Sequence, residues 1–127
     1  MPSTVDILVI EDDPTIGRLL KDIFTLAGRA VRLAPNIAAA NARLSEARPA
    51  LITLDLNMPG MSGQTFLEGV CMRPEMCGIP VIVITSQLPV EHIVTQLAAA
   101  VVAKPFDLDE LLAALERVLP GSGLLAV

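Results

Sequence analysis

Short apolar runs alternate along this chain with segments in which apolar residues recur at helical spacing. Ile7–Ile10 and Val81–Ile84 are apolar at every position, as expected for strands that are buried on both faces of a sheet. Between these runs, apolar residues recur every three or four positions, as they do on one face of a helix. This alternation predicts an α/β fold with a parallel sheet that is covered by helices on both faces.

Five strands and five helices follow from this pattern. The predicted strands are Ile7–Ile10, Ala30–Ala34, Leu51–Leu56, Val81–Ile84 and Ala100–Ala103. The predicted helices cover residues 14–27, 37–47, 64–70, 89–98 and 108–119. We expect a single domain over residues 1–120, followed by a short flexible C-terminal tail over residues 121–127.

Several predicted helices begin or end at residues that favour such boundaries. Asp13, Asn36 and Asp107 each precede a helical pattern, and their side chains accept hydrogen bonds from the first free amides of a helix. Pro14 suits the first helical turn, and Gly28 suits the position just after a helix end.

Composition and charge exclude some classes of function. The chain has 127 residues, a net charge of -5 and a pI of about 4.7. This charge argues against a nucleic-acid-binding face and against attraction to anionic membranes. Neither a membrane-spanning run nor a signal peptide is recognisable, so we expect a cytoplasmic protein.

Cys71 and Cys77 do not make a zinc site with the single histidine, and we interpret them as reduced thiols.

Polar side chains follow the predicted strands at the positions where each strand ends. They are Glu11, Asp12 and Asp13 after the first strand, Asp55 near the end of the third, Thr85 and Ser86 after the fourth, and Lys104 after the fifth. The carboxyl ends of parallel strands meet at one edge of the sheet. Several carboxylates would therefore lie there beside one lysine and one hydroxyl group.

Such a cluster favours a magnesium site and phosphoryl transfer. Neighbouring carboxylates repel one another unless a cation neutralises them. Mg2+ prefers oxygen ligands and commonly uses one or two carboxylates. A carboxylate can also attack phosphorus to give an aspartyl phosphate, provided that the charge of the equatorial oxygens is neutralised.

Four segments, in order, resemble the motifs of bacterial response-regulator receiver domains. They are Ile7–Pro14 with the acidic pocket, Leu54–Gly63 with the phosphoacceptor loop, Val81–Ser86 with the switch hydroxyl, and Lys104–Phe106 with the lysine followed by proline. The resemblance covers about residues 6–119. It implies a flavodoxin-like sheet with strand order 2-1-3-4-5.

The resemblance also implies roles for individual residues. Asp55 would be the phosphoacceptor, and the Mg2+ ligands would be Asp12, Asp55 and the backbone carbonyl of Asn57, with Glu11 acting through water. Thr85, Ser86 and Lys104 would surround the phosphoryl oxygens. The implied phosphodonor is a histidine kinase or a histidine phosphotransfer protein in a two-component system or phosphorelay. The implied output is an altered surface for an unknown downstream protein, on a monomer or a weak phosphorylation-dependent dimer.

Two features depart from the common receiver pattern. Val101 stands where many receivers carry an aromatic residue, three positions before the lysine, and the segment from Thr85 to Lys104 is short. The fourth helix is predicted to have about 10 residues with Pro89 in its first turn, a length of roughly 15 Å. We therefore expect the signal to travel by a shift of residues 86–97.

Two other interpretations compete with a stand-alone receiver. A small Mg2+-dependent phosphatase could use the same carboxylates, but it usually needs an aspartate two residues after its nucleophile, where this chain has Asn57. The chain could also be a receiver taken from a longer regulator or a hybrid kinase. Because the sequence begins at Met1 and ends without an obvious linker, we favour a stand-alone receiver that catalyses only its own phosphorylation and dephosphorylation.

Overall fold

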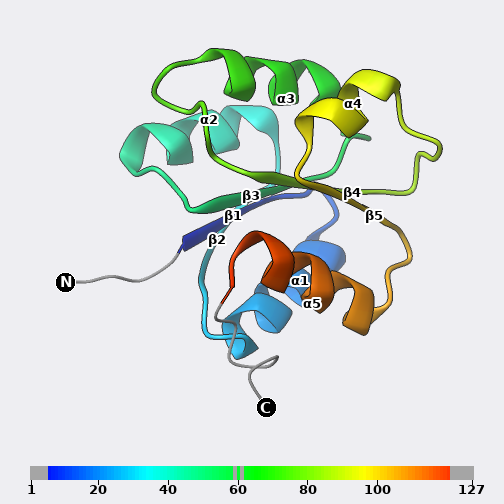
Figure 1. Cartoon of the computed structure of the whole chain (residues 1–127). Helices are drawn as coiled ribbons and strands as arrows, with labels where there is room; N and C mark the ends of the chain where they lie inside the picture. Colours follow the sequence, from blue (N-terminus) through cyan, green and yellow to red (C-terminus); the bar gives the residue numbers. More distant parts are fainter. Residues whose placement is uncertain (1–5, 59, 61, 121–127) are drawn as a thin grey trace.

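A five-stranded sheet lies at the centre of the computed structural model, which describes residues 6–58, 60 and 62–120. The strands are β1 (Asp6–Ile10), β2 (Ala30–Ala34), β3 (Leu51–Leu54), β4 (Val81–Thr85) and β5 (Ala100–Ala103). Their order is β2-β1-β3-β4-β5, and each neighbouring pair is parallel (Figure 1). The predicted fold and strand order are therefore confirmed.

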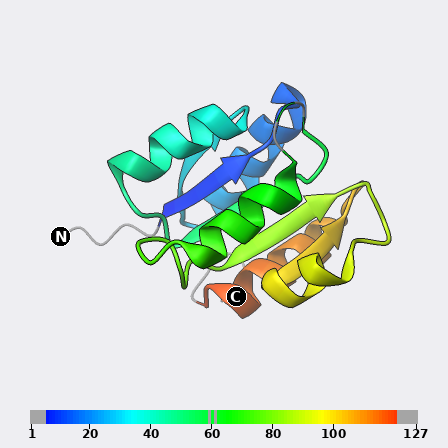
Figure 2. The same ribbon diagram turned by 90° about the horizontal axis from the view of Figure 1, so that it is seen from above.

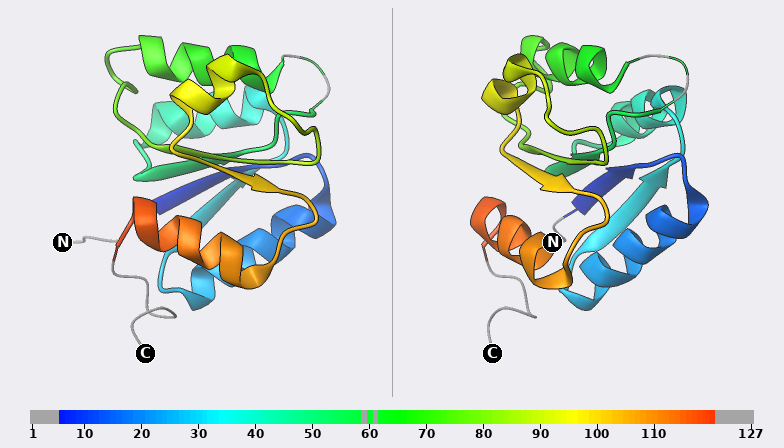
Figure 3. Two further views of the ribbon diagram at one scale, coloured as in Figure 1. Left: turned by 45° about the vertical axis from the view of Figure 1, so that its right-hand side comes forward. Right: turned by 90° about the vertical axis from the view of Figure 1, so that its right-hand side faces the viewer.

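Five helices cover the sheet in two layers. They are α1 (Pro14–Leu26), α2 (Ile37–Glu46), α3 (Gly63–Met72), α4 (His92–Leu97) and α5 (Leu108–Val118). Figure 3 shows α1 and α5 on one face of the sheet, and α2, α3 and α4 on the other. The view from above in Figure 2 shows these three helices side by side over the sheet. Among the described helices, none is both long enough and apolar enough to span a membrane.

Each face of the sheet has its own hydrophobic core. In β1, Leu8 and Ile10 belong to the core under α2, α3 and α4, whereas Ile7 and Val9 belong to the core under α1 and α5. All four side chains are almost completely buried. Successive side chains of a strand point to opposite faces, so a strand that is covered on both faces must be apolar at every position. This explains the continuous apolar runs in the sequence.

The predicted helix caps form as expected. The side chain of Asp13 accepts hydrogen bonds from the amides of Thr15 and Ile16. Asn36 and Asp107 cap α2 and α5 in the same way. Gly28 follows α1 with a φ of 89°, a conformation that costs glycine little because it has no Cβ.

Some predicted boundaries were wrong by one or two residues. The third strand ends at Leu54 and not at Leu56, because the amide of Asn57 turns back to the carboxylate of Asp55. The second helix ends at Glu46, and α3 extends beyond the predicted residues 64–70 at both ends. Ser62 provides its cap, since the hydroxyl accepts hydrogen bonds from the amides of Gln64 and Thr65.

The prediction for the fourth helix was wrong in length. α4 has 6 residues, not about 10, and Pro89 lies in the loop before it. Glu91 precedes the helix with an extended backbone (ψ 149°), and its side chain makes no capping hydrogen bond. The amide of Gln87 is bound to the hydroxyl of Thr85. This contact holds the start of the segment in a turn, so fewer residues remain for the helix.

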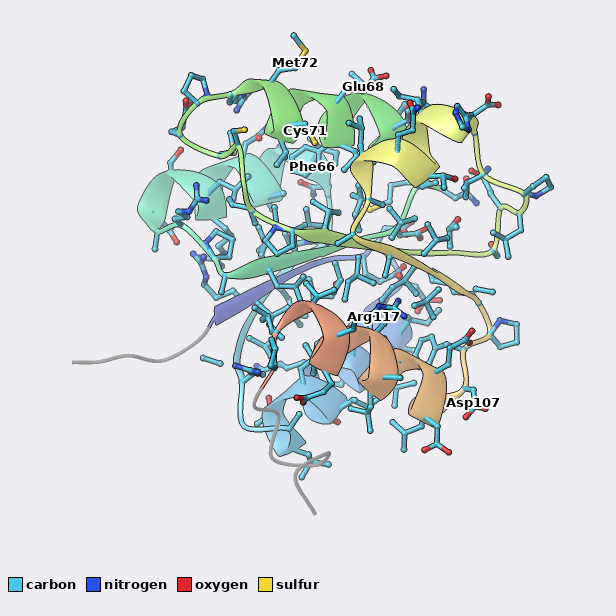
Figure 4. The ribbon with its side chains drawn as sticks, viewed as in Figure 1. Phe66, Glu68, Cys71, Met72, Asp107 and Arg117 are labelled. Atoms are coloured by element: carbon cyan, nitrogen blue, oxygen red, sulfur yellow. The ribbon has the colours of Figure 1, made fainter. Side chains whose placement is uncertain are left out.

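Some large apolar side chains of the helices are exposed. Leu108 is the first residue of α5 and is 49% exposed. Met72 is 82% exposed and points away from the domain in Figure 4, which also shows Phe66 on the sheet side of the same helix. Cys71 and Cys77 are free thiols, as predicted. The predicted tail, residues 121–127, lies outside the described residues.

Candidate functional site

The carboxyl edge of the sheet positions the backbone of the predicted site residues. The amide of Glu11 donates to the carbonyl of Ala34, and that of Asp55 donates to the carbonyl of Ile10. The amide of Lys104 likewise donates to the carbonyl of Thr85. The hydrogen-bond ladder of the sheet thus continues just past the strand ends. It brings residues from β1, β3 and β5 to one edge.

Lys104 connects two of the carboxylates. Its Nζ lies 2.6 Å from Oε1 of Glu11 and 3.0 Å from Oδ2 of Asp55. Only 12% of the lysine side chain is exposed, and the two carboxylates are more deeply buried still. Hydrogen bonds between charged groups are stronger than those between neutral groups. The ammonium group therefore neutralises part of the negative charge at this edge.

The second oxygen of Asp55 is held by its own loop. Oδ1 accepts a hydrogen bond of 3.0 Å from the amide of Asn57. The same loop packs closely against the start of α3, since a Cβ at Gly63 would lie 2.6 Å from Cα of Leu56 and 3.0 Å from the carbonyl oxygen of Asp55. Only glycine fits this approach without a shift of the backbone. Gly63 therefore helps to position Asp55.

Burial and charge act together on the ionisable groups. Burial raises the pKa of Glu11 above its usual value, and the hydrogen bond from Lys104 offsets only part of this effect. Burial alone would lower the pKa of Lys104, but its hydrogen bonds to Glu11 and Asp55 outweigh burial and raise it. The ammonium group therefore stays protonated at neutral pH.

Three carboxylates are close enough to share a metal ion. One oxygen each of Glu11, Asp12 and Asp55 lies within 4.8 Å of the others. Asp12 is exposed, whereas Glu11 and Asp55 are buried. An all-oxygen donor set that is partly open to solvent suits a hard cation that keeps some of its water, as Mg2+ does. The residues present therefore fit the cation that the sequence suggested.

Thr85 and Ser86 differ in their access to the site. Thr85 is completely buried, and its hydroxyl oxygen accepts a hydrogen bond of 3.0 Å from the amide of Gln87. Ser86 is exposed and lines the cavity of the site. The Thr85 hydroxyl oxygen is thus bound to its own loop.

An open cavity of about 470 Å³ covers the acidic cluster. Its lining residues are Glu11, Asp12, Asp13, Ile16, Asp55, Asn57, Ser86, Lys104 and Pro105. Six of the predicted site residues belong to this set, and Thr85 does not.

Two contacts that help to build the site were not predicted from the sequence. The bond between Glu11 and Lys104 joins residues 93 positions apart, and no sequence pattern pairs them. Gly63 was predicted only as part of a turn, although its contact with Leu56 requires glycine. Both depend on the tertiary approach of separate segments.

Comparison with known proteins agrees with this geometry. The family model for the response regulator receiver domain matches residues 7–116. The chain is 34% identical over 116 residues to the regulatory protein AtoC of Escherichia coli strain K12, covering 89% of this chain and 25% of AtoC. It is 30% identical over 115 residues to the sporulation initiation phosphotransferase F of Bacillus subtilis strain 168, covering 90% of this chain and 93% of that protein.

Solved structures agree as well. The chemotaxis protein CheY4 of Vibrio cholerae superposes with a TM-score of 0.84 at 28% identity, covering 92% of this chain and 100% of the CheY4 chain. The chain spans only 53% and 25% of the length of two of the curated relatives that it matches. Sequence, sheet order and site geometry thus lead to one assignment: the chain belongs to the response regulator receiver domain family, whose members are signalling modules.

Proposed function

We propose that Asp55 accepts a phosphoryl group, and that Mg2+ binds beside it at Asp12, Asp55 and the backbone carbonyl of Asn57, with Glu11 acting through water. The observation that carries the proposal is the position of Asp55. Its side chain is only 6% exposed, and its carboxylate lies 3.0 Å from the ammonium of Lys104 and shares the acidic cluster with Glu11 and Asp12. This environment suits a nucleophile whose product carries additional negative charge.

In the proposed reaction, a carboxylate oxygen of Asp55 attacks the phosphorus of a phosphohistidine. The new O–P bond forms as the P–N bond breaks, and the imidazole leaves with its electron pair and takes up a proton. Lys104 stays protonated and binds a phosphoryl oxygen. Ser86 is exposed at the cavity and leaves space for the incoming group. The Thr85 hydroxyl binds another phosphoryl oxygen after it turns away from Gln87.

Bound Mg2+ supplies charge neutralisation for the equatorial oxygens of the phosphoryl group. Asp12 suits a direct ligand because its carboxylate is exposed and makes no ion pair with a lysine among the described residues. Glu11 suits an indirect role because Lys104 already occupies Oε1. In these assignments Asp12 serves the metal alone, whereas Asp55 and Glu11 also contact Lys104.

The proposed partners are a histidine kinase or phosphotransfer protein as donor, and a downstream protein that recognises the phosphorylated surface. We propose that the chain works in the cytoplasm as a receiver over residues 1–120, as a monomer or a weak phosphorylation-dependent dimer. Its only chemistry would be its own phosphorylation and dephosphorylation. Phosphorylation would shift a pre-existing equilibrium between two conformations of this surface.

Labelling with acetyl phosphate and Mg2+ tests the proposal, with intact-protein mass spectrometry as the measurement. Wild type should gain one phosphoryl group, and Asp55→Asn should gain none. Asp13→Asn is the matched control, because Asp13 caps α1 from a neighbouring position and should leave labelling intact. Labelling of Asp55→Asn at the wild-type rate would refute the proposal.

A further inference from the structure

A groove runs between α2 and α3, away from the acidic site. It consists of two adjoining cavities of about 320 Å³ and 170 Å³, both of which are lined by Asn41, Arg73 and Met76. Some of its lining residues lie in the segments that connect α2 to β3 and α3 to β4. The groove therefore extends toward the amino ends of these strands. It shares no lining residue with the acidic cavity at their carboxyl ends.

The floor of the groove is apolar. Leu44 comes from α2, Phe66 and Val70 come from α3, and Met76 and Ile79 come from the following segment. Gly69 lines the smaller cavity, and a Cβ at this position would meet no atom within 4 Å outside its own helix backbone and chain neighbours. Glycine inside a helix costs about 1 kcal/mol relative to alanine. No packing contact explains a glycine at this position of α3.

Two guanidinium groups lie at the rim of the groove. Arg48 donates hydrogen bonds to the carbonyl oxygens of Glu75 and Cys77, at 2.6 Å and 3.4 Å. These bonds hold its side chain in place, and none of the ion pairs within the described residues includes Arg48. Arg73 is exposed and takes part in none of the ion pairs found in the described part of the chain.

The charge of the groove is opposite to that of the chain. Glu75 is the one acidic residue among the lining residues, against Arg48 and Arg73. The groove is therefore net positive on a protein with a net charge of -5.

Apolar pockets of roughly 300–1,000 Å³ with a few polar groups are typical of sites for small organic ligands. Arginine pairs well with carboxylate and phosphate groups because its planar donors can bind two oxygens at once.

We propose that the groove between α2 and α3 binds a small amphipathic organic anion. The apolar body of the ligand lies over Phe66 and Gly69, and its carboxylate, sulfonate or phosphate group binds Arg73. This site is independent of Asp55, so the proposal goes beyond phosphoryl transfer and does not rest on it.

Fluorescence titration of the full chain with anilinonaphthalene sulfonate tests the proposal, with uncharged phenylnaphthylamine as the comparison probe. We expect saturable binding of the sulfonate at one site and much weaker binding of the uncharged probe. Arg73→Gln should weaken sulfonate binding about tenfold or more, because a hydrogen bond to a charged group is lost. Gly69→Leu should fill the groove and reduce binding of both probes. Amide NMR shifts caused by the sulfonate should lie in residues 41–48 and 65–79.

Arg117→Gln is the matched control, because Arg117 is exposed on α5 on the opposite side of the sheet (Figure 4). It should bind the sulfonate as wild type does, and so should Asp55→Asn. Thermal melting of every variant confirms that it is folded. Equal binding of the two probes, unchanged binding by Arg73→Gln, or amide shifts outside these residues would each overturn the proposal.

Discussion

Nζ of Lys104 lies 2.6 Å from Oε1 of Glu11, and both side chains are largely buried at the carboxyl edge of the sheet. The same ammonium reaches Asp55 at 3.0 Å. Without a metal ion, Lys104 is therefore the cation that holds the acidic cluster together. In the proposed function, Mg2+ would act on carboxylates that Lys104 also contacts.

Lys104→Gln should destabilise the protein when Mg2+ is absent, because Glu11 and Asp55 then lose their cationic partner within a cluster of three carboxylates. We expect the free energy of unfolding to fall by about 1.5–3 kcal/mol, the range for a lost hydrogen bond to a charged group. Added Mg2+ should restore more stability in this variant than in wild type. Urea denaturation with and without Mg2+ measures both effects. Lys21→Gln on α1 is the control, since Lys21 is exposed. An equal gain in stability from Mg2+ in wild type, Lys104→Gln and Lys21→Gln would contradict the prediction.

Asp12→Ala should weaken Mg2+ binding more than Glu11→Ala does. A direct ligand contributes more to affinity than a residue that acts through water, for which losses of about 10–100-fold are typical. Isothermal titration calorimetry with MgCl2 gives the affinities, and the initial rate of labelling by acetyl phosphate should fall in the same order. Equal Mg2+ affinity in wild type and Asp12→Ala would show that the metal site lies elsewhere.

Beryllofluoride, which mimics a phosphoryl group on Asp55, should shift the amide signals of residues 87–97. The amide of Gln87 is bound to the Thr85 hydroxyl, and under the proposed function it would lose this partner when the hydroxyl turns to the phosphoryl oxygens. α4 has only 6 residues, and so short a helix depends on its packing for stability. Thr85→Ala should abolish the response at Gln87. Shifts confined to Asp55, Asn57 and Lys104 would point to an output surface elsewhere.

Gly63→Ala should destabilise the protein by about 1–3 kcal/mol, the usual cost of overpacking. Its Cβ would lie 2.6 Å from Cα of Leu56, so the loop that carries Asp55 must move and phosphorylation should slow. Gly69→Ala is the matched control on the same helix, because its Cβ meets no atom within 4 Å. This variant should be as stable as wild type or more stable by up to about 1 kcal/mol. Equal stability of the two variants, measured by urea denaturation, would contradict the prediction.

Cys77 should react with iodoacetamide before Cys71. Cys77 is exposed, whereas Cys71 is half-buried. Burial raises the pKa of Cys71, and the nearby thiol of Cys77 adds a smaller increase. Only the thiolate is nucleophilic, so a raised pKa lowers the reactive fraction at neutral pH, and the rate at Cys71 should still be rising at about pH 9. Peptide mass spectrometry of Cys71→Ser and Cys77→Ser separates the two rates. A faster reaction at Cys71 near neutral pH would contradict the prediction.

The sequence alone determined the order of the strands and helices and the edge of the sheet at which the acidic cluster lies. Ile7–Ile10 and Val81–Ile84 are apolar at every position because both faces of the sheet are covered, and this property is visible in the residue order. Asp13 and Asn36 set helix starts through contacts with amides two or three residues away. Local patterns of this kind need no knowledge of the tertiary structure.

Only the tertiary structure decided how these groups meet. The bond between Glu11 and Lys104 and the close approach of Gly63 to Leu56 each depend on how separate segments pack. The length of α4 could not be predicted either, because helical spacing fits residues 89–98 equally well whether or not Gln87 bonds to Thr85. Apolar periodicity records which face of an element is buried, whereas hydrogen bonds between side chains and loops depend on distances that arise only when the sheet and its two helical layers come together.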